Sequence, residues 1–184
     1  MARQNPRRTG AAVAASNLIE PVPYYRYFLG GTLESDDFLA GDVDDDGSGE
    51  LFLIIGGRVV SKRPNDQLLW QSELLEMRRL YAITDLDGDG AAALVASSGD
   101  NTYVFDAVTG AILWSQDSAV VGSFADLRIA DFDGDGLADL YAENNPCGVV
   151  TPQTPGTVFS FAGGFASPTT LWTVLERSRC GSFA

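Results

Sequence analysis

The sequence has no histidine, only two cysteines, and 12 Lys or Arg against 25 Asp or Glu. Without histidine, the chain lacks the commonest zinc ligand and the commonest general base near neutral pH. A net charge of −13 argues against a nucleic-acid partner, because the phosphates would be repelled. No stretch approaches the roughly 20 apolar residues that a membrane-spanning helix needs. The sequence therefore predicts neither nucleic-acid binding nor a membrane span.

The two cysteines, Cys147 and Cys180, lie near the carboxyl terminus. They either form a disulfide, which would fasten the terminus to the preceding segment, or remain two thiols, and the sequence leaves both open.

The rest of the composition is that of a folded chain rich in turns. Of its 184 residues, 45% are hydrophobic and 20% are charged, which argues against wholesale disorder. Twenty glycines and eight prolines separate short apolar runs, as expected of an all-β chain.

The acidic residues gather in loops whose carboxylates recur at alternate positions around glycine. In the clearest loop, Asp131, Asp133 and Asp135 hold the first, third and fifth positions, and Asp139 holds the ninth. Calcium takes six to eight oxygen ligands, and alternate residues of a tight loop can direct carboxylates at one point. The seventh position needs only a backbone carbonyl, so apolar Leu137 is tolerated there. We therefore predict a calcium site in this loop.

The same pattern occurs twice upstream, beginning 43 residues apart at Asp42 and Asp85, with 46 residues from Asp85 to Asp131. Such spacing is typical of repeats built from four short strands. In the second loop Ala93 occupies the ninth position, so that site is expected to be the weakest. The further predicted ligands are Asp42, Asp44, Asp46, Ser48 and Glu50 in the first loop, and Asp85, Asp87, Asp89 and Ala91 in the second, with Ser48 and Ala91 acting through their carbonyls.

The loops are not EF-hands, because Leu53, Ala96 and Ala142 stand where a bidentate glutamate would be required. Short apolar runs follow each loop and are too short for helices. The predicted strands are 38–42, 51–55, 58–61 and 67–70; then 79–84, 92–97, 102–105 and 111–114; then 127–130, 139–142, 157–161 and 170–174. Residues 144–156 form an inserted surface loop in the third repeat.

A tryptophan closes each repeat, at Trp70, Trp114 and Trp172. Because the three recur at matched positions, we predict that they are core wedges between neighbouring sheets.

Residues 41–51 and 130–140 resemble FG-GAP repeats of the integrin α-subunit type, and the likeness extends over about 36–175. The resemblance implies a β-propeller of four-stranded blades, with calcium in the loop between the first two strands of each blade. The expected blades are 36–72, 78–116 and 125–175, within a propeller segment spanning 21–184. Residues 1–20 are expected to be a flexible leader, with a cleaved signal peptide as the alternative.

Three blades are too few, since propellers close with about four to eight. We therefore expect this chain to be part of a larger propeller or to self-associate through its open ends, where residues 24–29 form one candidate strand.

The favoured function is a calcium-stabilised propeller segment for extracellular or cell-surface binding and adhesion to an unidentified protein or glycan, without enzymatic activity. One alternative is part of a carbohydrate-active enzyme such as a polysaccharide lyase; a purely structural repeat that binds no metal is another. For the enzyme, no acid/base pair stands out among the remaining carboxylates. The candidates for such a pair include Glu73, Glu76, Asp100, Asp106, Asp126 and Glu143.

Overall fold

A computed structural model describes residues 38–98, 101–117, 126–143 and 156–174. These residues form twelve β-strands and no helix, which confirms the all-β prediction for this part of the chain. The predicted leader, the candidate strand at 24–29, both cysteines and nearly all of the predicted insertion lie outside the described residues.

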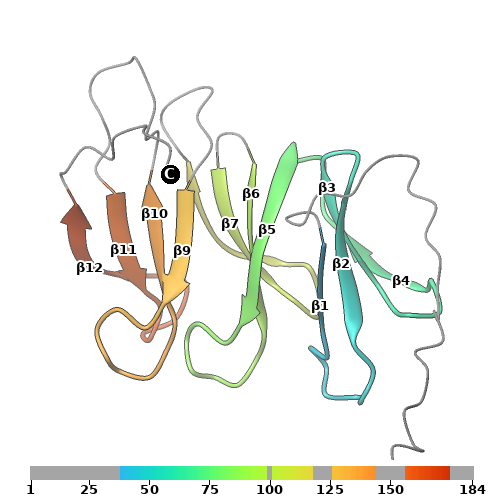
Figure 1. Cartoon of the computed structure of the whole chain (residues 1–184), viewed down its shortest axis with the longest axis horizontal. Helices are drawn as coiled ribbons and strands as arrows, with labels where there is room; N and C mark the ends of the chain where they lie inside the picture. The colour runs from blue at the N-terminus through green and yellow to red at the C-terminus, as the bar shows by residue number, and fades with distance from the viewer. Residues whose placement is uncertain (1–37, 99–100, 118–125, 144–155, 175–184) are drawn as a thin grey trace, which may run out of the picture.

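The strands form three antiparallel sheets of four, each in sequence order. Figure 1 shows the sheets side by side in an open row, without closure into a ring. The first strands contact across sheets, β1 with β5 and β5 with β9. The first sheet comprises β1 (Phe38–Gly41), β2 (Glu50–Ile55), β3 (Arg58–Lys62) and β4 (Leu68–Gln71); the second β5 (Met77–Thr84), β6 (Ala93–Ser98), β7 (Asn101–Asp106) and β8 (Ile112–Asp117); the third β9 (Asp126–Ala130), β10 (Asp139–Glu143), β11 (Gly156–Ser160) and β12 (Thr169–Val174).

Every predicted strand overlaps an observed one, with ends that differ by at most three residues. One boundary is wrong: Gly156, assigned to the insertion from the sequence, is the first residue of β11. A Cβ at this position would collide with the Tyr141 ring of the neighbouring strand, so glycine permits this close pairing.

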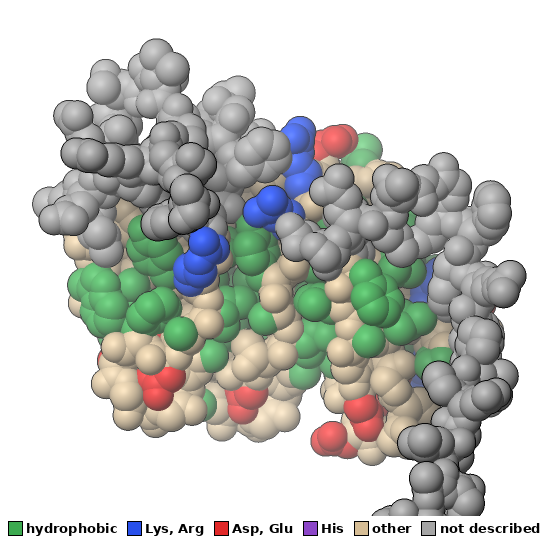
Figure 2. Space-filling view, viewed as in Figure 1, with side chains coloured by type: hydrophobic (Ala, Val, Ile, Leu, Met, Phe, Trp, Pro, Cys, Tyr) green, Lys and Arg blue, Asp and Glu red, His purple; other side chains and the backbone are tan. Residues whose placement is uncertain are grey.

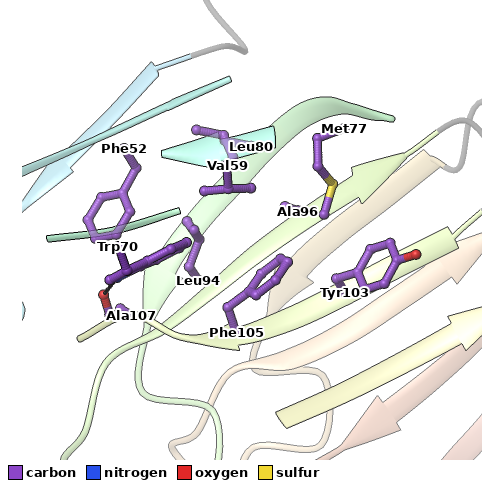
Figure 3. Packing of buried hydrophobic residues seen from close by; sticks show 10 residues of the cluster. All are labelled: Phe52, Val59, Trp70, Met77, Leu80, Leu94, Ala96, Tyr103, Phe105 and Ala107. Carbon is purple, nitrogen blue, oxygen red and sulfur yellow. Dashed lines mark hydrogen bonds between the residues drawn. The ribbon is translucent and has the colours of Figure 1, made fainter. Parts of the chain in front are cut away.

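The second sheet is covered on both faces, and all six residues of β6 are buried. One cluster lies between the first and second sheets and includes Phe52, Trp70 and Phe105 (Figure 3). The Trp70 ring centroid is 6.0 Å from that of Phe52 in its own sheet and 6.1 Å from that of Phe105 in the second sheet. Its indole Nε1 donates a 2.9 Å hydrogen bond to the Ala107 carbonyl. Trp70 therefore joins the two sheets as predicted.

Gly110, in the β7–β8 turn, makes room for this tryptophan. Its φ of +75° lies in the left-handed region, and a Cβ there would be 2.5 Å from the Trp70 ring. Only glycine satisfies both conditions without strain.

A second cluster lies between the second and third sheets. The Trp114 ring lies 5.3 Å from both Phe159 and Phe161, measured between centroids, so the wedge prediction is confirmed for Trp114 as well.

The wedge prediction is wrong for Trp172 within the described structure. Its side chain is 41% exposed and meets Phe132, in the loop between β9 and β10, edge-on at a centroid distance of 5.9 Å. The physical reason is that a wedge needs a following sheet, and the described residues form only three. No helix among the described residues is long and apolar enough to cross a membrane.

Candidate cation sites in the strand-connecting loops

The three acidic loops connect β1 to β2, β5 to β6, and β9 to β10, and all lie at one edge of the row of sheets (Figure 1). We call them the first loop (42–50), the second loop (85–93) and the third loop (131–139). Figure 2 shows Asp and Glu side chains gathered along this edge, below a band of hydrophobic side chains. Each loop is held by the antiparallel pair of strands from which it emerges.

The loops share one backbone frame. The first-position aspartate accepts a hydrogen bond from the sixth residue: Gly47 N to Asp42 Oδ2 at 3.0 Å, Gly90 N to Asp85 Oδ2 at 3.0 Å, and Gly136 N to Asp131 Oδ2 at 3.1 Å. These glycines have φ of +85°, +86° and +93°, which explains why glycine stands at the sixth position.

Each frame brings three carboxylates together, with one ligand oxygen from each within 4.8 Å of the others. The groups are Asp42, Asp44 and Glu50; Asp85, Asp87 and Asp89; and Asp131, Asp133 and Asp139. Two predicted fifth-position ligands, Asp46 and Asp135, do not belong to their groups. Each instead accepts a 2.8 Å hydrogen bond from the backbone N of the seventh residue, Ser48 or Leu137.

In the second loop the fifth-position Asp89 makes the same turn contact, accepting from Ala91 N at 2.7 Å, and also belongs to the group. The seventh residues, Ser48, Ala91 and Leu137, thus donate their backbone amides to the fifth-position aspartates. The proposed role of their carbonyls as calcium ligands stays a prediction.

The ninth-position carboxylates of the first and third loops are completely buried. Glu50 and Asp139 are the first residues of β2 and β10. One oxygen of each accepts a backbone hydrogen bond from the loop's second residue, Val43 N at 3.1 Å and Phe132 N at 2.9 Å. The other oxygens, Glu50 Oε1 and Asp139 Oδ1, are buried without a hydrogen-bond partner among the described residues.

A buried carboxylate oxygen without a partner is costly, by about 1–3 kcal/mol or more for a charged group. A cation held between it and the two neighbouring aspartates would remove that cost. The first and third loops therefore have the donors and the electrostatic need for a dication.

The second loop lacks this feature, because its ninth residue is Ala93, which is 2% exposed. Burial, together with the nearby charges of Asp89 and Asp85, raises the pKa of Asp87 above its ordinary value. Three carboxylates gather in the second loop, but none of its described residues has a buried carboxylate oxygen without a hydrogen-bond partner.

The sequence analysis missed Arg63, which lies in the β3–β4 turn. Its Nη2 lies 3.1 Å from Asp44 Oδ2 and 3.2 Å from Asp46 Oδ2, so a guanidinium already contacts the first loop. A comparison of the three repeats could have found it, because the corresponding turns at 107–111 and 161–168 contain neither Lys nor Arg.

The second and third loops are also in contact. A Cβ placed on Gly88 would lie 3.2 Å from Leu137 Cδ1, so the seventh residue of the third loop packs against the fourth residue of the second.

The fold and the loops define a class: an all-β protein of repeated four-stranded sheets, each with an acidic loop between its first two strands. No protein-family model matches the chain, and no curated protein matches its sequence.

Solved structures are similar to it. Rhamnogalacturonan lyase PL11 of Bacillus licheniformis is 18% identical with a TM-score of 0.52, covering 75% of this chain and 33% of the lyase. The biofilm matrix protein Bap1 of V. cholerae is 20% identical with a TM-score of 0.49, covering 74% of this chain and 19% of Bap1. The chain thus spans a third or less of the length of these proteins. At 18% identity the likeness to the lyase shows a shared β-rich fold alone.

Proposed function

We propose that this chain is a calcium-binding β-propeller segment of the FG-GAP type, serving extracellular binding or adhesion, in which the ions are structural. The observation that carries the calcium proposal is the pair of buried, unpartnered oxygens, Glu50 Oε1 and Asp139 Oδ1, each beside two aspartates.

The donor set favours calcium over other dications. Every candidate ligand is an oxygen, and the loops contain no cysteine or histidine, as zinc and copper would prefer. Magnesium demands a stricter octahedron and keeps several waters, whereas calcium accepts the irregular arrangement of carboxylates and carbonyls that a flexible loop supplies.

The propeller part of the proposal rests on repetition. Three sheets of the same strand order lie in one row, and two of the three tryptophans pack onto the next sheet. A propeller is the closed form of such a row, with each sheet as a blade. Further blades, from a longer chain or a second copy, would complete it.

In this reading each ion joins the first two strands of one blade, and loops elsewhere contact the protein or glycan partner outside the cell. We prefer this function to the enzyme alternative, for which the catalytic acid and base would have to come from carboxylates outside the three loops. Asp106, for example, accepts the backbone hydrogen bonds of Val108 and Thr109 and so serves its own turn.

Calcium titration monitored by thermal melting tests the proposal. We expect the melting temperature to rise at submillimolar to millimolar calcium, the range of extracellular modules, and magnesium to have a smaller effect. A melting temperature that is the same in excess calcium and in chelator would refute the calcium proposal.

A further inference from the structure

Among the ion pairs of the described residues, a positive charge contacts the first loop but not the third. Both loops have a buried ninth carboxylate with an unpartnered oxygen, and both gather two aspartates beside it. Only in the first does a basic side chain from the turn between the third and fourth strands reach the loop, because the third sheet has no Lys or Arg in the corresponding turn.

Arg63 is held in position for this contact by its own turn. Its backbone N donates a 2.9 Å hydrogen bond to the Gln67 carbonyl, and its carbonyl accepts one from Asp66 N at 3.0 Å. From there the guanidinium contacts both Asp44, a member of the carboxylate group, and Asp46, the fifth-position residue. The side chain is 35% exposed, so the contact is partly screened by water.

We propose that Arg63 is a built-in counter-ion that sets the calcium affinity of the first loop. This inference rests on the proposed calcium function. The guanidinium neutralises part of the loop's charge when no calcium is bound, which stabilises the empty loop. The same positive charge repels an incoming dication and occupies oxygens of Asp44 and Asp46, which weakens calcium binding. The first site is therefore weaker than its ligand set alone would make it.

Two effects of opposite sign follow from removing the charge in Arg63→Gln. The chelated protein should melt at a lower temperature, because the loop carboxylates lose their counter-ion. Calcium should bind the first loop about tenfold more tightly, the order expected for removing one positive charge beside a dication in a partly hydrated setting. A residue that only held the fold would lower stability and affinity together.

The experiment is calorimetric calcium titration of the full chain in which only the first loop is intact. Four exposed or half-exposed aspartates are replaced for this background: Asp87→Asn, Asp89→Asn, Asp133→Asn and Asp135→Asn. Arg63→Lys keeps the charge and should bind calcium within about threefold of the background. Lys62→Gln is the matched control, since it removes a neighbouring positive charge that pairs with Asp66 at 2.7 Å, and it should change affinity little.

Tighter calcium binding with a lower chelated melting temperature in Arg63→Gln supports the inference. Unchanged or weaker binding in Arg63→Gln, while the background binds calcium, overturns this inference and leaves the proposed function standing. If neither the background protein nor its Arg63→Gln variant binds calcium, while circular dichroism shows an intact fold, the Arg63 inference and the proposed calcium function are both overturned for this loop.

Discussion

At the scale of single residues, the ninth position of the loop distinguishes a cation site from an acidic turn. Exposed aspartates tolerate one another because water screens them, whereas Glu50 and Asp139 are fully buried and each leaves one oxygen unsatisfied. The neighbouring backbone amides of Val43 and Phe132 fix the first oxygen of each carboxylate and so orient the second.

The first prediction concerns Glu50→Gln and Asp139→Asn. Each amide retains an oxygen for the backbone hydrogen bond but removes the buried charge, so the melting temperature in chelator should not fall by more than a few degrees. The calcium-induced rise in melting temperature should shrink in either variant and be smallest in the double variant, where only the carboxylate group of the second loop is unchanged.

Asp45→Asn is the matched control for that prediction. Asp45 lies in the same loop outside the carboxylate group, and its φ of 57° is one that asparagine tolerates. A loss of calcium response in this variant equal to that of Glu50→Gln would show that net charge, not the buried carboxylate, controls binding.

The residue pattern predicted most of the carboxylates that gather, because alternate positions of a tight loop can direct their side chains at one point. It could not predict that Asp46 and Asp135 serve mainly as turn acceptors, since that depends on the positions of the seventh-residue amides. It also could not find Arg63, which is far from the first loop in sequence and meets it through the pairing of β2 with β3.

At the scale of elements, the loops should differ in affinity although their frames are alike. Asp133→Ala and Asp87→Ala, at the third position of each loop, compare the third and second loops by calorimetry. We expect the first substitution to remove more calcium affinity, because of these two loops only the third has a buried ninth carboxylate whose charge the ion balances. The ranking is wrong if Asp87→Ala costs more.

The packing between sheets gives a second element-scale prediction. Trp70 is 9% exposed and hydrogen-bonded to the neighbouring sheet, whereas Trp172 is 41% exposed. Trp70→Ala should therefore lower the free energy of unfolding by about 3–5 kcal/mol, as for other buried tryptophans. Trp172→Ala should cost about 1 kcal/mol or less. Urea unfolding of the two variants measures the difference, and equal losses would contradict it.

Strand order and strand positions were predictable because turn residues and apolar runs repeat three times along the chain. The exposure of Trp172 was not predictable from its position in the repeat. A tryptophan at that position packs between two sheets only where another sheet follows, and none follows the third among the described residues.

At the scale of the whole molecule, the open row leaves an apolar end. Phe132 and Trp172 are 36% and 41% exposed, while the corresponding second-loop residue, Leu86, is completely buried against the third sheet. We predict that the chain self-associates at micromolar concentration in calcium buffer, because burying such faces is worth about 25 cal/mol for each Å² removed from water.

Sedimentation velocity measures the association, and a double variant with Phe132→Ser and Trp172→Ser should shift the distribution toward monomer. Ile112→Ser and Leu68→Ser, at exposed hydrophobic positions of the other two sheets, form the matched control. A wild-type chain that remains a compact monomer at high micromolar concentration would contradict this prediction.

The graded burial of the three tryptophans also makes the chain its own optical probe. Trp70 is enclosed between two sheets, Trp114 is half-buried, and Trp172 faces solvent in part. The indole of Trp70 should fluoresce at shorter wavelength than that of Trp172 and resist acrylamide quenching. In a chain whose other two tryptophans are replaced by phenylalanine, a red shift would report separation of the first and second sheets, and would reveal whether they part before either sheet unravels.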